Sequence, residues 1–155
     1  MAYQFRQGFF QPKFPEKYQG NPNQIVFRSS WERKLMFKLD LTKEVISWAS
    51  EELAIPYFDP VTNKMRRYFI DFLVTYRGKN NEIYKLAIEV KPYTQTIPPQ
   101  PPKNKNKNKK AYNRWLLNLR TFEVNKSKWK SAMKWCKENG YKFVILHEKN
   151  VGGLF

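Results

Sequence analysis

The sequence has very few of the residues from which disulfide frameworks and zinc sites are built. Its 155 residues include one cysteine, Cys136, and one histidine, His147. A single cysteine excludes an internal disulfide and a cysteine-rich zinc site, and a single histidine has no partner for a histidine cluster. No apolar run approaches the roughly 18 residues of a membrane-spanning helix, and Met1–Lys13 lacks the apolar core of a signal peptide. These absences argue against a secreted protein and predict no contact with a membrane interior.

Acidic residues are also scarce. The chain has 13 Asp and Glu against 29 Lys and Arg, a formal net charge of +16. Such a surface favours a polyanion, with DNA or RNA as the first candidate and an acidic protein or anionic membrane as the alternative. The hydrophobic share of 41% argues against general disorder, and the length fits one domain. Because acids are so few, each one in an apolar setting needs a reason.

Two apolar, β-prone runs carry such acids. The run 67–74 contains Asp71, and the run 86–91 contains Glu89 and Lys91. Side chains alternate along a strand, so Glu89 and Lys91 share one face and Val90 takes the other. With Asp71 on the neighbouring strand, two carboxylates and an ammonium should lie close together. This composition is typical of a magnesium-dependent phosphodiesterase site.

Magnesium prefers oxygen ligands and keeps several waters, and a divalent metal can neutralise a phosphate and activate water. We expect Asp71 and Glu89 to be direct ligands and the backbone carbonyl of Val90 to be a further one. Lys91 would contact the attacking water and offset charge on the phosphate. No small-molecule cofactor is expected.

Glu32 lies in the first turn of a helix predicted over residues 31–41, after an N-cap at Ser29 or Ser30. Two interpretations carry nearly equal weight. Glu32 complements the positive end of the helix, or it is a third carboxylate that holds metal waters or a second metal. The apolar stripe predicted to face the core is Trp31, Leu35, Met36 and Leu39.

The rest of the chain predicts an α/β protein, a mixed β-sheet flanked by helices, in one domain over residues 1–155. Strands are predicted at 25–27, 45–48, 51–57, 66–76, 82–91 and 141–146, the last of them parallel to an earlier strand. Helices are predicted at 111–119 and 126–139, with a short strand at 122–124 between them. Asn125 would cap the second helix and Gly140 would close it. Trp129, Met133 and Cys136 would form its buried stripe.

Two segments lack a regular period. Residues 1–24 are expected to be an irregular arm that is pinned to the body by its aromatic side chains, or that docks on DNA or another partner. Residues 94–110, rich in Pro and then in Lys and Asn, are expected to be a mobile basic loop. It is either a solvated insertion or, as we favour, a loop that lies on phosphates. The predicted DNA contacts are Lys103, Lys105, Lys107, Lys109 and Lys110.

The order Glu32, Ile70-Asp71, Glu89-Val90-Lys91 resembles the PD-(D/E)XK nuclease superfamily, with Ile70 where proline is common. Almost the whole chain resembles the head completion nucleases of T-even-like tailed phages and is similar to TnsA-type transposon endonucleases. The segments that carry the resemblance are 27–33, 55–58, 66–71, 88–92 and 124–130.

The resemblance implies a restriction-endonuclease-like fold and Mg²⁺-dependent cleavage of DNA, with Mn²⁺ as a substitute metal. It carries Glu32, Asp71, Glu89 and Lys91 over as the active site, and it adds Asn125 and Lys128 as residues that contact phosphate or merely cap and face solvent. It also implies head, portal or neck proteins as partners. The place of action would be the host cytoplasm during assembly or, if the protein is retained, the head–tail joint of the virion. The alternatives are a DNA-binding structural protein of that joint without catalysis and, less favoured, a junction- or sequence-specific endonuclease.

Overall fold

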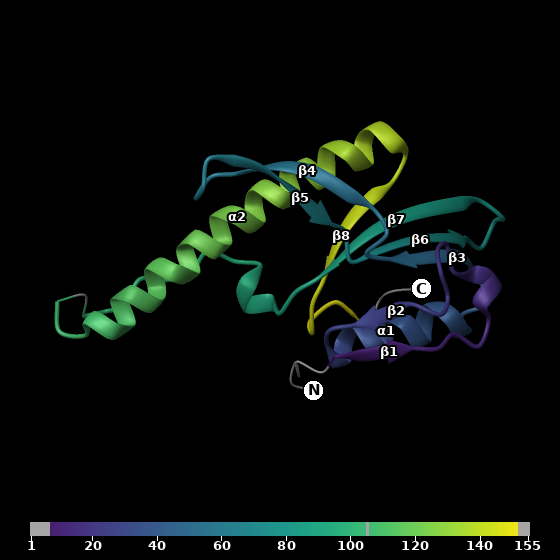
Figure 1. Cartoon of the computed structure of the whole chain (residues 1–155), viewed down its shortest axis with the longest axis horizontal. Coiled ribbons are helices and arrows are strands. Elements are labelled where there is room, and N and C mark those ends of the chain that lie inside the picture. The colour runs from purple at the N-terminus through teal and green to yellow at the C-terminus, as the bar shows by residue number, and fades with distance from the viewer. Residues whose placement is uncertain (1–6, 105, 152–155) are drawn as a thin grey trace.

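The computed structural model describes residues 7–104 and 106–151, and it is an α/β structure with helices on both faces of a mixed sheet (Figure 1). In chain order the elements are β1 Gly8–Phe10, the 3₁₀ helix η1 Pro15–Lys17, β2 Ile25–Phe27, α1 Ser30–Leu41, β3 Val45–Ser50, β4 Ala54–Asp59, β5 Lys64–Phe69, β6 Phe72–Arg77, β7 Ile83–Val90, the 3₁₀ helix η2 Tyr93–Gln95, α2 Lys109–Asn139 and β8 Lys142–Leu146. The predicted fold class is confirmed. None of the helices in these ranges is long and apolar enough to cross a membrane.

The central sheet has the strand order β3-β6-β7-β8. Neighbours are antiparallel except β7 and β8, which are parallel. A parallel pair needs a crossover connection, and α2 supplies it. The predicted parallel pairing of the last strand is therefore confirmed.

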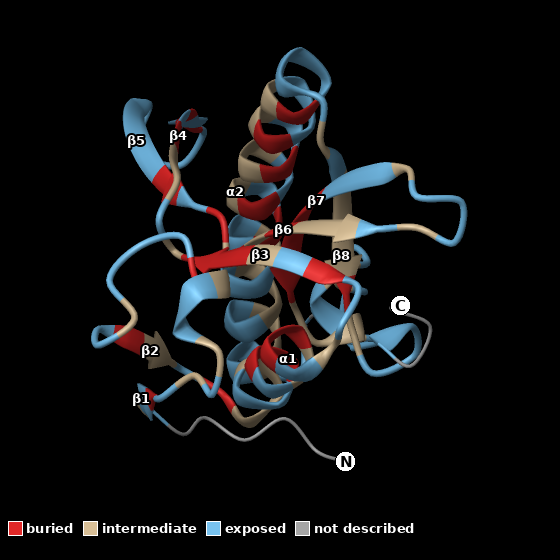
Figure 2. Cartoon of the chain, turned by 90° about the vertical axis from the view of Figure 1, so that its right-hand side faces the viewer, coloured by how far each residue is buried: buried red, intermediate tan, exposed pale blue. Residues whose placement is uncertain are grey.

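The two faces of the sheet bury different layers. On one face, α1 packs Leu35, Met36 and Leu39 against β3, β6 and β7, with Trp48 and Phe72 among the largest buried side chains. On the other face, α2 packs against the sheet and against a two-stranded ribbon, β4–β5. Figure 2 shows the buried residues of α1 and α2 on the sides that meet the strands. Because side chains alternate along β7, each face receives every second residue of that strand.

The single strand predicted over residues 66–76 is wrong. The run is divided at Ile70–Asp71, where the chain leaves the β4–β5 ribbon and enters the central sheet as β6. Ile70 N–H donates to the Leu53 carbonyl at 3.2 Å, and Glu51 N–H donates to the Asp71 carbonyl at 3.1 Å. Both flanking strands are β-prone, so the apolar pattern continues across the break and hides it. The break places Asp71 immediately before β6.

The break predicted within the second helical region is also wrong, because α2 runs without interruption from Lys109 to Asn139. The predicted strand at 122–124 and the cap at Asn125 both lie inside this helix. Asn108 is the N-cap and accepts a hydrogen bond from Ala111 N–H at 3.1 Å. Gly140 ends the helix in the left-handed conformation, with φ 75°, as predicted. In the buried stripe, Ala132 takes the place predicted for Met133, which is 53% exposed, while Cys136 is buried as expected.

Part of the N-terminal arm is regular, contrary to expectation. Residues 8–10 form β1, which pairs with β2 in an antiparallel ribbon. Phe10 and Tyr18 are buried in the core. The buried Asp40 carboxylate on α1 accepts hydrogen bonds from the N–H groups of Lys13 and Phe14, at 2.7 and 3.1 Å. These contacts pin residues 10–18 to the body.

Candidate active site

Asp71 and Glu89 face each other across the β6–β7 pair. Phe72 pairs with Ile88 in the antiparallel register, and one further step along both strands sets Asp71 opposite Glu89. Ile88 and Val90 point to the α1 face, so Glu89 and Lys91 project to the α2 face. The alternation predicted for residues 89–91 therefore holds in the structure.

Hydrogen bonds fix both carboxylates. Asp71 Oδ2 accepts from Val90 N–H at 2.8 Å, which ties Asp71 to the Glu89-Val90-Lys91 segment. Glu89 is almost fully buried, and its Oε1 lies 3.2 Å from Lys91 Nζ. The Tyr68 hydroxyl on β5 donates to the other oxygen, Oε2. Asp71, Glu89 and Lys91 are thus brought together as predicted, and Tyr68 is an addition that sequence reasoning missed.

The electrostatics of the site oppose a negative charge on Asp71. Removal of water raises the pKa of the Asp71 carboxyl well above its usual range, and the charge of Glu89 raises it further. The hydrogen bond from Val90 and the charge of Lys91 act in the other direction. Desolvation and the Glu89 charge also raise the pKa of the Tyr68 hydroxyl, which keeps it protonated as a donor.

The donor set of this site fits a hard divalent cation. Two desolvated carboxylates on facing residues gain stability from a cation between them, because it offsets their repulsion. Among residues 7–104 and 106–151, no group of three Asp, Glu, His or Cys side chains is arranged as a metal cage. Magnesium does not require one, because it is usually held by one or two carboxylates and retains waters.

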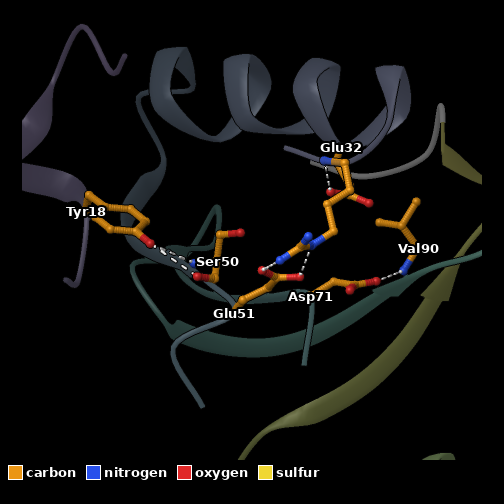
Figure 3. A network of polar contacts seen from close by, with 7 residues as sticks. Tyr18, Glu32, Ser50, Glu51, Asp71 and Val90 are labelled. Carbon is orange, nitrogen blue, oxygen red and sulfur yellow. Dashed lines mark hydrogen bonds and ion pairs between the residues drawn. The ribbon is translucent and has the colours of Figure 1, made fainter. Parts of the chain in front are cut away.

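Glu32 lies at the N-terminal end of α1 and close enough to Asp71 for its charge to act there. Its backbone N–H donates to Ser29 Oγ, the N-cap, and its carboxylate accepts from Arg28 N–H at 2.8 Å. Its side chain also lies on the side of α1 that faces Glu51 and Asp71 (Figure 3). Burial is the largest cause that raises the pKa of Glu32, and the Glu32 charge in turn raises the pKa of Asp71. Glu32 therefore accepts a backbone hydrogen bond at the N-terminal end of α1 and adds negative charge at the site.

Glu51 is a fourth acid at this edge that sequence reasoning missed. Its carboxylate forms two hydrogen bonds with the Arg28 guanidinium, at 2.9 and 3.2 Å. Glu51 has φ 53°, a left-handed conformation that is uncommon for a residue other than glycine. This conformation turns the chain out of β3 and directs its N–H to the carbonyl of Asp71. The scarcity of acids was the one signal in the sequence that pointed to Glu51.

Lys128 on α2 completes the α2 side of the site. Its ammonium lies over the rings of Tyr57 and Tyr68, at 5.5 and 5.7 Å from their centroids. Burial lowers the pKa of Lys128, the nearby charge of Lys91 lowers it further, and the charges of Glu89 and Asp71 oppose that change. Asn125, one turn earlier, is buried inside α2 and does not cap it.

Comparison with known proteins places this chain in a family. The family described as "TnsA-like endonuclease N terminal" matches residues 42–148. The chain belongs to the TnsA-like endonuclease family. It is also 37% identical over 154 residues to the "Head completion nuclease" of Enterobacteria phage T4, across 99% of this chain and 97% of that protein. No solved structure matches the chain.

The TnsA-like match contains Asp71, Glu89, Lys91 and Lys128, and it begins after Glu32. The identity with the phage T4 nuclease extends over the N-terminal region as well. The predicted membership of this nuclease group is therefore confirmed, and the chain is a nuclease by family.

Two of the predicted lysine contacts, Lys109 and Lys110, lie far from the carboxylates in this TnsA-like domain. Lys109 and Lys110 begin α2, and the first turns of α2 project beyond the sheet (Figure 1). Between Lys109 and Lys128 the helix rises roughly 28 Å at about 1.5 Å per residue. Lys103 and Lys107 precede that helix end and are exposed, whereas Lys105 lies outside the described residues. The structure therefore separates the carboxylates from the described lysines of this group, Lys109 and Lys110 above all.

Proposed function

We propose that this protein is a Mg²⁺-dependent deoxyribonuclease that hydrolyses phosphodiester bonds in phage head completion, preparing DNA-filled heads for tail joining. The name of the phage T4 relative supports the setting, and the family supports the reaction class. The net charge of +16 supports DNA as the substrate. We further propose Mn²⁺ as a substitute metal.

One observation carries the proposal. The Asp71 carboxylate accepts a hydrogen bond from the backbone N–H of Val90, the residue between Glu89 and Lys91. This bond fixes Oδ2, so we expect Oδ1 of Asp71 and Glu89 to hold the cation, with the Val90 carbonyl as a further ligand. A bound magnesium ion would supply charge neutralisation at the phosphate and an activated water. Glu32 would hold waters of that ion.

The other residues of the site hold the carboxylates in place or neutralise charge on the phosphates. Tyr68 holds Glu89 in one orientation through its hydroxyl. In the proposed complex, Lys91 leaves its ion pair with Glu89 to donate to the attacking water and to a phosphate oxygen, where a positive charge stabilises the developing negative charge. Lys128 provides a second cation for a neighbouring phosphate. The ion pair of Arg28 with Glu51 holds the segment that pairs with Asp71 just before β6.

The lysine cluster would bind DNA away from the cut. At about 3.4 Å per base pair, the roughly 28 Å between Lys109 and Lys128 corresponds to about eight base pairs. We propose that Lys103, Lys105, Lys107, Lys109 and Lys110 contact phosphates at that distance. Head, portal or neck proteins would be the docking partners. The place of action would be the host cytoplasm during assembly, with the head–tail joint as the place of a retained copy.

The test is DNA cleavage by matched variants. The unaltered protein, Asp71→Ala and Glu138→Ala are incubated with linear DNA in Mg²⁺ or in EDTA. Glu138 is an exposed acid near the end of α2 and serves as the control. We expect Mg²⁺-dependent cleavage by the unaltered protein and by Glu138→Ala, and at least a hundredfold loss in Asp71→Ala, in line with the loss of a transition-state contact. Equal cleavage by all three proteins, or none by any, would refute the proposal.

A further inference from the structure

A cavity lies between η2 and the middle of α2. Its volume is about 280 Å³, just below the usual range of roughly 300–1,000 Å³ for small-molecule sites. Gln95 on η2 and Asn118, Thr121 and Asn125 on α2 provide its amide and hydroxyl groups, and Ile97 and Phe122 are among its apolar walls. The cavity therefore combines hydrogen-bonding groups with apolar surface.

Asn125 is the residue in this cavity that most needs a partner. It is 6% exposed, and its side-chain amide forms no hydrogen bond with any residue of 7–104 or 106–151. Buried amides are nearly always hydrogen-bonded, and the Asn125 amide atoms keep some accessible surface where the residue lines the cavity. A buried amide that lines a cavity and has no protein partner points to a ligand in that cavity.

Helix α2 contributes residues both to the cavity and to the proposed active site. Asn118, Thr121, Asn125 and Lys128 recur every three or four residues and so share one face of the helix. Asn125 lies about 4.5 Å along the axis from Lys128, close to the roughly 3.4 Å rise of one nucleotide along a strand. A DNA strand that places a phosphate at Lys128 would bring a neighbouring nucleotide to the cavity.

The chemistry of the cavity selects a base over a phosphate. None of the described residues that line it is charged, whereas phosphate sites are built from Arg, Lys or clustered N–H groups. Amide and hydroxyl groups can donate to and accept from the edge of a base, and apolar walls can pack on its faces. We propose that this cavity is a nucleobase pocket, which takes one unpaired base of the DNA strand next to the cleaved bond. The inference rests on the proposed nuclease function.

The pocket predicts a preference for unpaired DNA near the cut, because a paired base must first be flipped out at a cost. The test uses an end-labelled single-stranded oligonucleotide with Mg²⁺, in which one abasic residue is moved position by position. We expect one position beside the cut to lower kcat/KM about tenfold, the effect of losing one stacked base. Tolerance of an abasic residue at every position would overturn the inference.

Variants assign that effect to the pocket. Asn118→Ala and Thr121→Ala alter exposed positions of α2, and each is expected to lower kcat/KM several-fold on the intact oligonucleotide but not on the sensitive abasic one. The matched control, Asn113→Ala, changes an exposed asparagine of α2 outside the pocket and should cleave both like the unaltered protein. Equal losses on both oligonucleotides would overturn the inference.

The two proposals fail in different ways. Cleavage that depends on Asp71 but shows no abasic-sensitive position refutes the nucleobase pocket alone. Cleavage that persists in Asp71→Ala refutes the nuclease site on which the pocket rests. Thermal unfolding of Asn125→Ala, compared with the two exposed variants, separates any loss of folding from a loss of base contact. A correctly folded Asn125→Ala that cleaves the intact oligonucleotide at the unaltered rate also overturns the pocket.

Discussion

Replacement of Asp71 by Asn should stabilise the metal-free protein while abolishing its response to magnesium. The amide oxygen can still accept from Val90 N–H, so the hydrogen bond at 2.8 Å is kept. What is lost is a negative charge that desolvation and Glu89 both disfavour. Because the pKa of Asp71 is raised in the folded state, its contribution to stability is full below the unfolded pKa near 3.8 and is lost as the pH rises through the folded pKa.

We expect Asp71→Asn to be more stable than the unaltered protein in EDTA and less stable than it in magnesium. Relief of one disfavoured charge is worth about 1–2 kcal/mol within the usual range for single substitutions. At about 2–4 °C per kcal/mol for a chain of this size, Asp71→Asn should raise Tm by roughly 2–8 °C in EDTA at pH 7.5. Magnesium at one hundred times its Kd should stabilise the unaltered protein by about 2.7 kcal/mol. That corresponds to roughly 5–11 °C, and we expect little or no such gain in the variant.

Thermal unfolding followed by circular dichroism tests this at pH 5 and pH 7.5, in EDTA and in Mg²⁺. The control is Asp40→Asn, because the Asp40 carboxylate holds two backbone N–H groups and has no part in the site. It should be destabilised and should keep the full magnesium response. The reasoning is refuted if Asp71→Asn is less stable than the unaltered protein in EDTA at pH 7.5, or gains as much from magnesium.

Three further predictions test individual groups. Tyr68→Phe removes the hydroxyl that holds Glu89, so kcat should fall about tenfold, in line with loss of a positioning contact, and an unchanged kcat would contradict this. Glu32→Gln keeps an acceptor for Arg28 N–H, so the free energy of unfolding should change by less than about 0.5 kcal/mol while cleavage falls. Ser29→Ala, which removes the N-cap, should cost about 1 kcal/mol. A Glu32→Gln variant with normal cleavage would leave the helix end as the only role of Glu32. Replacing the lysine cluster by Gln should reduce the slope of log binding constant against log salt concentration by about 0.9 per lost phosphate contact. Cleavage of duplexes shorter than about eight base pairs should not change. A loss of cleavage on short duplexes would place the cluster at the cut. The lysines to replace together are Lys103, Lys107, Lys109 and Lys110.

Features with a local cause were predictable from the sequence. Ser29 caps α1 because a hydroxyl at that position can accept a free N–H of the first turn. The shared face of Glu89 and Lys91 follows from the alternation of any strand. Gly140 ends α2 because the left-handed conformation there favours glycine. Each needs only a few neighbouring residues to specify it.

Features that depend on distant partners were not predictable. The break at Ile70–Asp71 arises because β5 pairs with β4 whereas β6 pairs with β3 and β7, and nothing in the run itself records two different partners. Helix α2 passes through residues 122–125 because Val124 packs into the layer between α2, the sheet and the ribbon, and Phe122 is buried against Trp129 of the same helix. This packing overrides their β propensity. Tyr68 and Glu51 join the site for the same reason, since long-range contacts bring them to it.

The central claim is that Asp71 and Glu89 hold a divalent cation at the site of cleavage. The most direct measurement is anomalous diffraction from a crystal of the protein soaked in Mn²⁺. The soak is then repeated with Mg²⁺. The account predicts a single strong peak between the two carboxylates, with ligand oxygens at about 2.0–2.2 Å, and loss of that peak in Asp71→Asn. A Mn²⁺ peak elsewhere, or a peak that persists unchanged in Asp71→Asn, would contradict the account.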